Sequence, residues 1–145
     1  MKRLEPNEGG LRFLVNVQLK SRNRRFLRLL SEAVARIPGD VPPVESVTKV
    51  RLRARGPRGY VGLVTYSVAG GRKANQTIDF YTSLLFDLSR KAALGVVVHE
   101  LAHAWLNEHI SPEESESRER DADRTAASWG FKKELEALER EAVTL

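Results

Sequence analysis

The residues His99-Glu100-Leu101-Ala102-His103 place two imidazoles four positions apart, with a carboxylate directly after the first. In an α-helix, positions i and i+4 lie about 40° apart around the axis, so both rings leave the same face one turn apart. Their nitrogens can then bind one metal ion. Glu100 is rotated by about 100° from His99, so its carboxylate can reach a water molecule on that metal without being a ligand. The pentapeptide therefore predicts a metal site with a general base beside it.

The segment around the pentapeptide is predicted to be a helix that is buried on several sides. Arg90 to Leu106 is rich in Ala and Leu, contains no Pro, and follows Ser89, a residue type that caps helix N-termini. Its apolar residues are distributed nearly all round the helix. Two His and one Glu in such a helix need polar partners, because burying them unpaired is costly. This favours a metal site over two ordinary core histidines.

A third metal ligand must come from elsewhere, since a catalytic zinc ion usually has three protein ligands and a water. His109 follows His103 by six residues, the interval of the metzincin pattern HExxHxxGxxH. Metzincins have a glycine midway that ends the helix, but here that position is Leu106, a good helix former. If the helix continues, His109 lies about 240° from His103 and points away. The methionine that metzincins carry downstream is also missing, because the only methionine is Met1.

The second candidate ligand is Glu119, in the acidic stretch from Ser111 to Gly130. This stretch begins with Ser-Pro, has acidic residues in its first turn and ends at a Gly, so it is predicted to be one helix. Among its acidic residues only Glu119 has another carboxylate four positions later, at Asp123, and the two would share a helix face. Glu119 could then bind the metal while Asp123 accepts a hydrogen bond from the outer nitrogen of a ligand histidine. The other acidic residues fit a solvated, salt-bridged helix.

HELAH, followed after a short connection by Glu119-Arg120-Asp121-Ala122-Asp123, resembles the HExxH and ExxxD motifs of gluzincin metallopeptidases, especially their small single-domain forms. It is also similar to the ImmA/IrrE-like metallopeptidases. The match covers residues 94–131. The resemblance implies a zincin-like fold and one zinc ion held by His99, His103 and Glu119. It also implies that Asp123 supports a ligand histidine and that Glu100 is the catalytic residue.

In the rest of the chain, the spacing of apolar residues indicates the elements that must position these residues, and Gly and Pro mark where the elements end. They are a strand over 11–19, a helix over 21–37, three strands over 47–55, 59–68 and 76–81, and an amphipathic helix over 131–145. The last of these either completes the fold or covers the active-site cleft.

This order predicts an α+β fold with a single zincin-like domain over residues 1–145. A small mixed β-sheet would pack on a backing helix and on the HExxH helix, followed by a glutamate-bearing helix and a C-terminal helix. The resemblance to zincins further implies that the last strand, Gln76 to Tyr81, is the edge strand of the cleft. A bound peptide would add to this edge through main-chain hydrogen bonds. The substrate-binding residues would be Thr77, Ile78, Asp79, Phe80 and Tyr81.

The composition indicates which kinds of partner the chain can have. There is no cysteine, no apolar run of about 18 uncharged residues, and no signal-peptide core near Met1, so a cytoplasmic protein without membrane contact is expected. The formal net charge is +5, and basic residues gather over 20–28 and 49–58, where nucleic acid or an acidic protein could bind. Acidic residues mixed among the basic ones, and the lack of interleaved aromatics, favour a solvated surface instead.

Two functions are compatible with these residues. The first is a zinc metallopeptidase, a hydrolase of peptide or protein substrates, in which Glu100 deprotonates a zinc-bound water and returns the proton to the leaving amine. The alternative is a non-catalytic zinc-binding module that uses the zincin fold to bind a protein or DNA. The intact Glu100 favours the enzyme, since a structural zinc site needs no base. Cobalt or manganese could occupy the same ligands, and Tyr60, Tyr66 and Tyr81 are available to stabilise an oxyanion.

Overall fold

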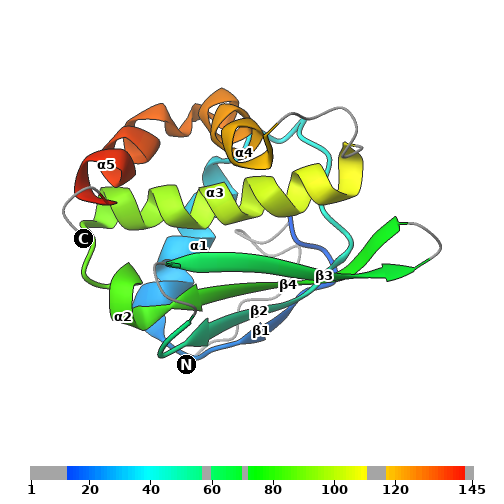
Figure 1. Ribbon diagram of the computed structural model, residues 1–145, viewed down its shortest axis with the longest axis horizontal. Coiled ribbons are helices and arrows are strands. Elements are labelled where there is room, and N and C mark those ends of the chain that lie inside the picture. Colours follow the sequence, from blue (N-terminus) through cyan, green and yellow to red (C-terminus); the bar gives the residue numbers. More distant parts are fainter. Residues whose placement is uncertain (1–12, 57–59, 70–71, 111–116, 143–145) are drawn as a thin grey trace.

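The sheet and the helices lie in separate layers in the computed structural model, which describes residues 13–56, 60–69, 72–110 and 117–142. A four-stranded mixed sheet forms the lower layer in Figure 1, and the longest helix crosses above it. The strands are β1 (Gln18–Lys20), β2 (Val47–Arg53), β3 (Gly62–Ala69) and β4 (Arg72–Tyr81). The helices are α1 (Arg24–Arg36), α2 (Thr82–Leu85), α3 (Arg90–His109), α4 (Arg118–Ala126), the π-helical turn η2 (Ala127–Phe131) and α5 (Lys132–Ala142). The predicted α+β class with a small mixed sheet is therefore confirmed.

The strand order in space is β1-β2-β4-β3, which differs from the order in the chain. β1 and β4 both run parallel to β2, whereas β3 pairs antiparallel with β4. The predicted strand over 11–19 is shorter than expected, since only its last part pairs as β1, and Leu14 makes an isolated bridge to Val44. Residues 11 and 12 of that prediction lie outside the described residues.

The prediction that Gln76 to Tyr81 forms the edge strand of the cleft is wrong. This segment belongs to β4, whose Ile78 pairs with Val50 of β2 on one side and with Val64 of β3 on the other. Its main-chain groups are therefore used by two neighbouring strands and cannot pair with a peptide. The same correction applies to Thr77, Ile78, Asp79, Phe80 and Tyr81 as substrate-binding residues. The edge strand on this side of the sheet is β3.

The helix boundaries follow local capping chemistry. Asn23 and Ser89 each accept a hydrogen bond from a main-chain N–H three residues later, which starts α1 and α3. The prediction of one helix across 111–130 is wrong at Ser117, which is extended (φ −148°, ψ 113°) and caps α4 by accepting from the main-chain N–H of Arg120. The predicted first turn, 111–116, lies outside the described residues. The stop at Gly130 is confirmed, with φ +100°, a conformation that favours glycine.

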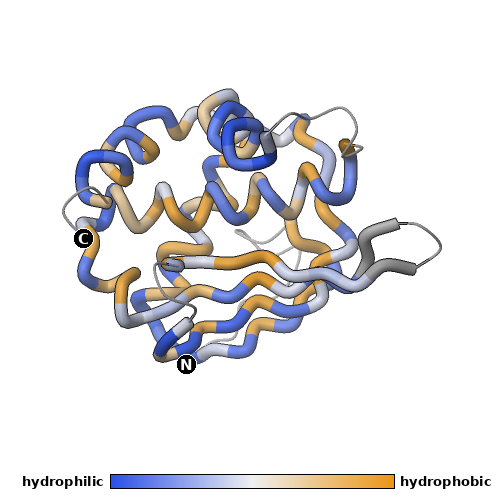
Figure 2. The backbone as a smooth tube through the Cα atoms, viewed as in Figure 1, coloured by the Kyte–Doolittle hydropathy of each residue, from blue (hydrophilic) through white to orange (hydrophobic). Residues whose placement is uncertain are grey.

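α3 is the central element of the core. It is buried on several sides as predicted, because the sheet and α1 cover one side of it and α4 and α5 cover the other. Figure 2 shows many hydrophobic residues along α3, whereas α4 is mostly hydrophilic. Phe26 of α1 meets Phe80 of β4 with ring centroids 5.3 Å apart, which joins the backing helix to the sheet. Within the described residues, no helix combines the length and apolar character that crossing a membrane requires.

α5 completes the fold by packing on α3 and α1. Arg36 of α1 lies 2.9 Å from the Glu134 carboxylate, donates to the Gly130 carbonyl at 3.2 Å, and stacks over the Phe131 ring at 4.4 Å. On the other side, Gly95 lets α5 approach α3 closely. A Cβ at position 95 would lie 2.6 Å from the Glu134 carbonyl oxygen and 3.3 Å from Leu138 Cβ. Only glycine fits this contact.

Gly95→Ala is therefore expected to lower the free energy of unfolding by about 1 to 3 kcal/mol, although Ala is the better helix former. The loss arises because the added methyl group would push the α5 backbone away from α3. Urea unfolding of the two proteins measures this change in the free energy of unfolding. Lys91→Ala, at an exposed position of the same helix, is the control and should change stability by less than about 0.5 kcal/mol. A Gly95→Ala variant as stable as this control would contradict the close packing.

Candidate metal site

His99 and His103 leave the same face of α3, as their spacing predicts. Their Nε2 atoms lie 3.1 Å apart and their rings meet edge to face. Both side chains are largely buried, with 13% and 14% of their surface exposed. Two convergent imidazole nitrogens at this separation can act as ligands of one ion.

Glu119 of α4 completes the predicted ligand set. Its Oε2 lies 3.0 Å from His99 Nε2 and its Oε1 lies 2.9 Å from His103 Nε2. One ligand atom from each of the three residues fits within 4.8 Å. The small residues Ala122 and Ala126, both fully buried, allow α4 to approach α3 closely enough for this contact. Two imidazoles and one carboxylate are a usual donor set of catalytic zinc.

Asp123 lies where the sequence places it, one helical turn after Glu119. Its Oδ1 is 2.8 Å from His99 Nδ1, the ring nitrogen that faces away from Glu119. Since a carboxylate accepts, His99 Nδ1 carries a proton and donates it to Asp123. This contact fixes the tautomer and the orientation of the His99 ring, and it leaves Nε2 as the nitrogen that can bind a metal.

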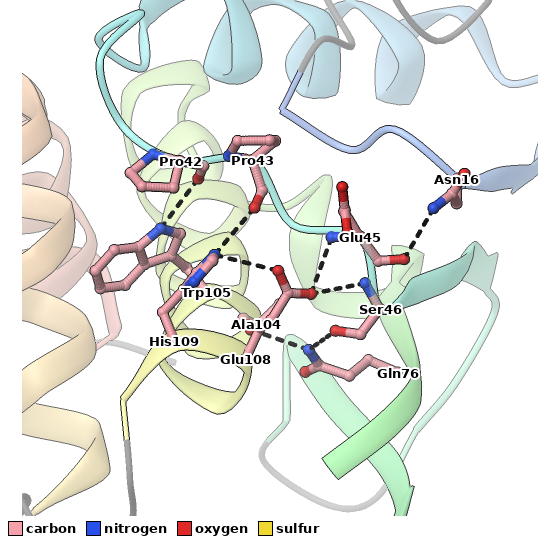
Figure 3. A network of polar contacts seen from close by, with 10 residues as sticks. All are labelled: Asn16, Pro42, Pro43, Glu45, Ser46, Gln76, Ala104, Trp105, Glu108 and His109. Carbon is pink, nitrogen blue, oxygen red and sulfur yellow. Dashed lines mark hydrogen bonds and ion pairs between the residues drawn. The ribbon is translucent and has the colours of Figure 1, made fainter. Parts of the chain in front are cut away.

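His109 does not join this cluster. α3 continues through His109, as Leu106 predicts, so the ring points toward the segment before β2. Its Nε2 donates to the Pro43 carbonyl at 3.0 Å and lies 3.2 Å from Glu108 Oε2 (Figure 3). Trp105 Nε1 donates to the Pro42 carbonyl at 3.1 Å in the same network. His109 therefore has a structural role at the end of the helix.

The same network anchors α3 to the sheet. Glu108 Oε1 accepts from the main-chain N–H groups of Glu45 and Ser46, at 2.9 and 2.7 Å. The fully buried Gln76 of β4 donates from Nε2 to Ser46 Oγ and to the Ala104 carbonyl, as Figure 3 shows, and accepts from Asn107. Buried polar networks that are fully satisfied hold their elements rigidly. β4 thus positions α3, the helix that carries His99 and His103.

Glu100 lies beside the two histidines, against the edge strand. It is 8% exposed, and a Cβ at Gly62 of β3 would lie only 2.8 Å from its Cγ and 3.1 Å from Oε2. Burial is the main cause that raises the pKa of Glu100, to about 7; the negative charge of Glu119 adds to this effect and the positive charge of His99 opposes it. A carboxylate with this pKa can exchange a proton near neutral pH.

The charges of the other site residues are strongly coupled. Burial lowers the pKa of His99, but its hydrogen bonds to Asp123 and Glu119 outweigh burial and raise that pKa to about 10. The hydrogen bond from His99 is the largest cause that lowers the pKa of Glu119, to about 2. Burial, and then the charge of His99, lower the pKa of His103. Without a metal, His99 therefore carries a second proton, on the Nε2 atom that faces Glu119, in the place that a cation would take.

Comparison with protein-family models, with curated proteins and with solved structures gave no match to this chain. The chemistry of these side chains is therefore what indicates a function.

A cleft of about 260 Å³ opens over the cluster, between α3 and β3. It is lined by Tyr60, Gly62, Leu63, Val64, Tyr66, His99, Glu100, His103, Asn107, Arg118 and Glu119. Of the three tyrosines that the sequence offers, Tyr60 and Tyr66 line the cleft. Tyr81 does not, because it is 3% exposed and its ring lies against Gly56.

Sequence reasoning did not find Gly62, Asn107 and Arg118 as cleft residues. Asn107 lies one helical turn after His103, so the four-residue spacing that places the two histidines on one face could also have predicted Asn107 there. Gly62 and Arg118 reach the cleft only because β3 and α4 pack beside α3. No local pattern in the sequence predicts that β3 and α4 pack beside α3.

Proposed function

We propose that this protein is a zinc-dependent metallopeptidase that hydrolyses peptide bonds. The observation that carries the proposal is the convergence of His99, His103 and Glu119, whose ligand atoms fit within 4.8 Å, next to the buried carboxylate of Glu100. A structural metal site would not require a base with a pKa of about 7 beside its ligands. The resemblance of the HExxH and ExxxD motifs to gluzincins supports the same assignment.

A zinc ion held by His99, His103 and Glu119 would polarise a peptide carbonyl and make a water molecule acidic enough to attack it. Glu100 accepts the proton of the attacking water and then donates it to the leaving amine. Its burial keeps the proton affinity high enough for both steps. Asp123 holds the His99 ring in place by accepting from Nδ1 throughout.

The edge of β3 supports a peptide as the substrate. Among the described residues, β3 pairs only with β4, so the main-chain groups along its other side face the cleft. An extended peptide could hydrogen-bond to these groups whatever its side chains are. Because Gly62 of this strand touches Glu100, a peptide on the edge would have its main chain close to the general base.

The metal content of the purified chain tests the proposal. Wild-type protein and the His109→Ala variant are expected to hold close to one zinc ion per chain, while Glu119→Ala loses it, because removing a ligand leaves only two imidazoles. Elemental analysis measures this. The same preparations are then incubated with a degenerate peptide library and the products are identified by mass spectrometry.

Hydrolysis is expected only with zinc present; it should stop when a chelator removes the metal and return when zinc is added back. Wild-type protein that binds zinc but cleaves no peptide would contradict the enzyme and support a non-catalytic zinc-binding module. Absence of bound metal in the wild type, even with zinc supplied, would contradict both.

Gly62→Ala is expected to keep the zinc ion and to slow peptide hydrolysis by about tenfold to a hundredfold. The added Cβ would displace the Glu100 side chain, and a shift of about 1 Å in a catalytic group can have an effect of this size. Rates on a peptide found in the library screen measure it, with zinc content determined in parallel. Thr65→Ala, at an exposed position of β3 that does not line the cleft, is the control for a general effect on the strand. Equal rates in the two variants would contradict the role of the Gly62 contact.

A further inference from the structure

Basic and acidic residues occupy different parts of this chain. Residues 9–31 and 46–78, which supply β1, the first part of α1, β2, β3 and most of β4, contain 13 basic residues and no acidic one. The remaining residues contain 11 basic and 19 acidic ones. The two kinds of charge are mixed in the composition as a whole, but the positive charge belongs mainly to the strands and the negative charge mainly to the later helices.

The outer face of the sheet, which points away from the long helix, carries much of the exposed positive charge. α3, α4 and α5 all lie above the sheet in Figure 1. Val50 of β2 and Ile78 of β4 belong to the core between the sheet and these helices, so the residues next to them in each strand point the other way. Three of the four exposed side chains of β1 and β2 are cations, namely Lys20, Lys49 and Arg53.

The charge on this face is only partly neutralised. Asp79 of β4 makes a two-point contact with Arg51, with Nε 2.6 Å from Oδ1 and Nη2 2.8 Å from Oδ2. Lys20 lies beside Arg51 in the register of β1 and β2, and Lys49 and Arg53 flank Arg51 along β2. These three cations have no ion-pair partner among the described residues. Because like charges side by side in a sheet destabilise it, a bound anion would relieve the repulsion.

The positive patch continues past the end of β1. Arg22 and Arg24 follow Lys20 within four residues and are exposed. Arg24 begins α1, whose first turn has no acidic residue to balance the partial positive charge of a helix N-terminus. Arg53 lies at the same end of the sheet, since β1 and β2 are parallel. We call these five exposed residues the basic face: Lys20, Arg22, Arg24, Lys49 and Arg53.

The chemistry of the basic face favours nucleic acid over an acidic protein. A protein interface usually has an apolar core rich in aromatic residues, whereas an interface with nucleic acid is more polar and much more positively charged. The exposed side chains of β1 and β2 are Gln18 and three cations, so these strands offer no apolar core. They also offer no aromatic ring on which the bases of a single strand could stack. A double helix, which presents its phosphates outward, fits such a face better.

The lack of uncharged polar groups favours DNA over RNA. Proteins that bind duplex RNA contact its 2′-hydroxyl groups as well as its phosphates, and exposed cations serve the phosphates. We therefore propose that the basic face binds the phosphate backbone of double-stranded DNA, whatever the base sequence. This binding does not depend on the proposed peptidase activity. The cleft lies between α3 and β3, on the helix side of the sheet, so DNA and a peptide could be bound at the same time.

Fluorescence anisotropy of a labelled DNA duplex of about 20 base pairs, titrated with the full chain at several salt concentrations, tests the proposal. At about 50 mM salt the wild type is expected to bind with a dissociation constant in the micromolar range. The slope of log K against log salt should be about −4, as four or five neutralised phosphates require. No binding of the duplex at this salt concentration would overturn the proposal.

The double variant Lys49→Gln with Arg53→Gln locates the binding surface. It should weaken binding by at least about tenfold and bring the slope about 2 closer to zero, because two phosphate contacts are lost. The matched control is Lys132→Gln with Lys133→Gln, which removes two exposed cations from α5 and should bind within about twofold of the wild type. Equal losses in the two double variants would overturn the basic face as the binding surface. If the first double variant does not fold, Lys20→Gln with Arg22→Gln makes the same test.

Three competitors test the choice of duplex DNA as the partner. Single-stranded DNA of the same sequence, the corresponding RNA duplex and polyglutamate are each used to displace the labelled duplex. All three are expected to compete less well than unlabelled duplex DNA. Stronger competition by polyglutamate would show that the face binds an acidic protein, and stronger competition by RNA or by the single strand would likewise overturn the choice. DNA binding by a protein that cleaves no peptide would refute the peptidase function alone.

Discussion

Glu100→Gln is expected to retain one zinc ion per chain and to lose peptide hydrolysis by about 10² to 10⁴. Gln has the shape of Glu but cannot accept a proton from the attacking water. The fold should tolerate the change, because Glu100 is 8% exposed and burial already favours its neutral form, with a pKa of about 7. Metal content should also be unchanged, since the ligand atoms belong to His99, His103 and Glu119.

The measurement compares initial rates of zinc-loaded wild type and Glu100→Gln on one cleaved peptide, beside zinc content from the same samples. Glu136→Gln, an exposed carboxylate of α5, is the matched control and should cleave at the wild-type rate. Full activity in Glu100→Gln would show that another group is the base. Loss of zinc from this variant would show instead that Glu100 is a ligand, which would contradict the site described above.

The site residues on α3 and α4 could be predicted from the sequence because their relationships are local. Four-residue spacing within one helix fixes which side chains share a face, and this relates His99 to His103 and Glu119 to Asp123. Ser89 and Gly130 likewise act through their own backbone, as a cap and as a stop. That the two pairs face one another was an inference from chemistry, and the distances of 2.8 to 3.0 Å between them support it.

The position of a strand within the sheet could not be predicted in this way, because it depends on pairing between distant segments. The resemblance to zincins implies that the segment 76–81, the last predicted strand, lies at the edge, but it lies between β2 and β3. One signal was present. Ile78 and Phe80 are buried on one face of this strand, and Asp79 and Tyr81 are buried on the other, which is typical of an interior strand. Thr65, Tyr66 and Ser67 of β3 are exposed, as an edge strand allows.

The affinity for zinc is expected to rise with pH by about tenfold per unit between pH 6.5 and 8.5. The hydrogen bonds to Asp123 and Glu119 overcome the effect of burial and raise the pKa of His99 to about 10, so His99 carries a proton on Nε2 throughout this range. Zinc must displace that proton. Glu119 is already ionised, since its pKa is lowered to about 2, and the lowered pKa of His103 leaves this ring largely neutral. About one proton should therefore be released for each ion bound.

Calorimetric titrations in two buffers of different ionisation enthalpy count the released protons, and competition with a chelator gives the affinity at each pH. Asp123→Asn is the informative comparison. Without the Asp123 carboxylate the pKa of His99 falls, so at pH 8.5 fewer protons should be released and the affinity should depend less on pH. A wild-type affinity that does not change over these two pH units would mean that His99 is already deprotonated before the metal binds. In that case the carboxylates of Asp123 and Glu119 would not raise the pKa of His99, although they lie 2.8 and 3.0 Å from its ring nitrogens.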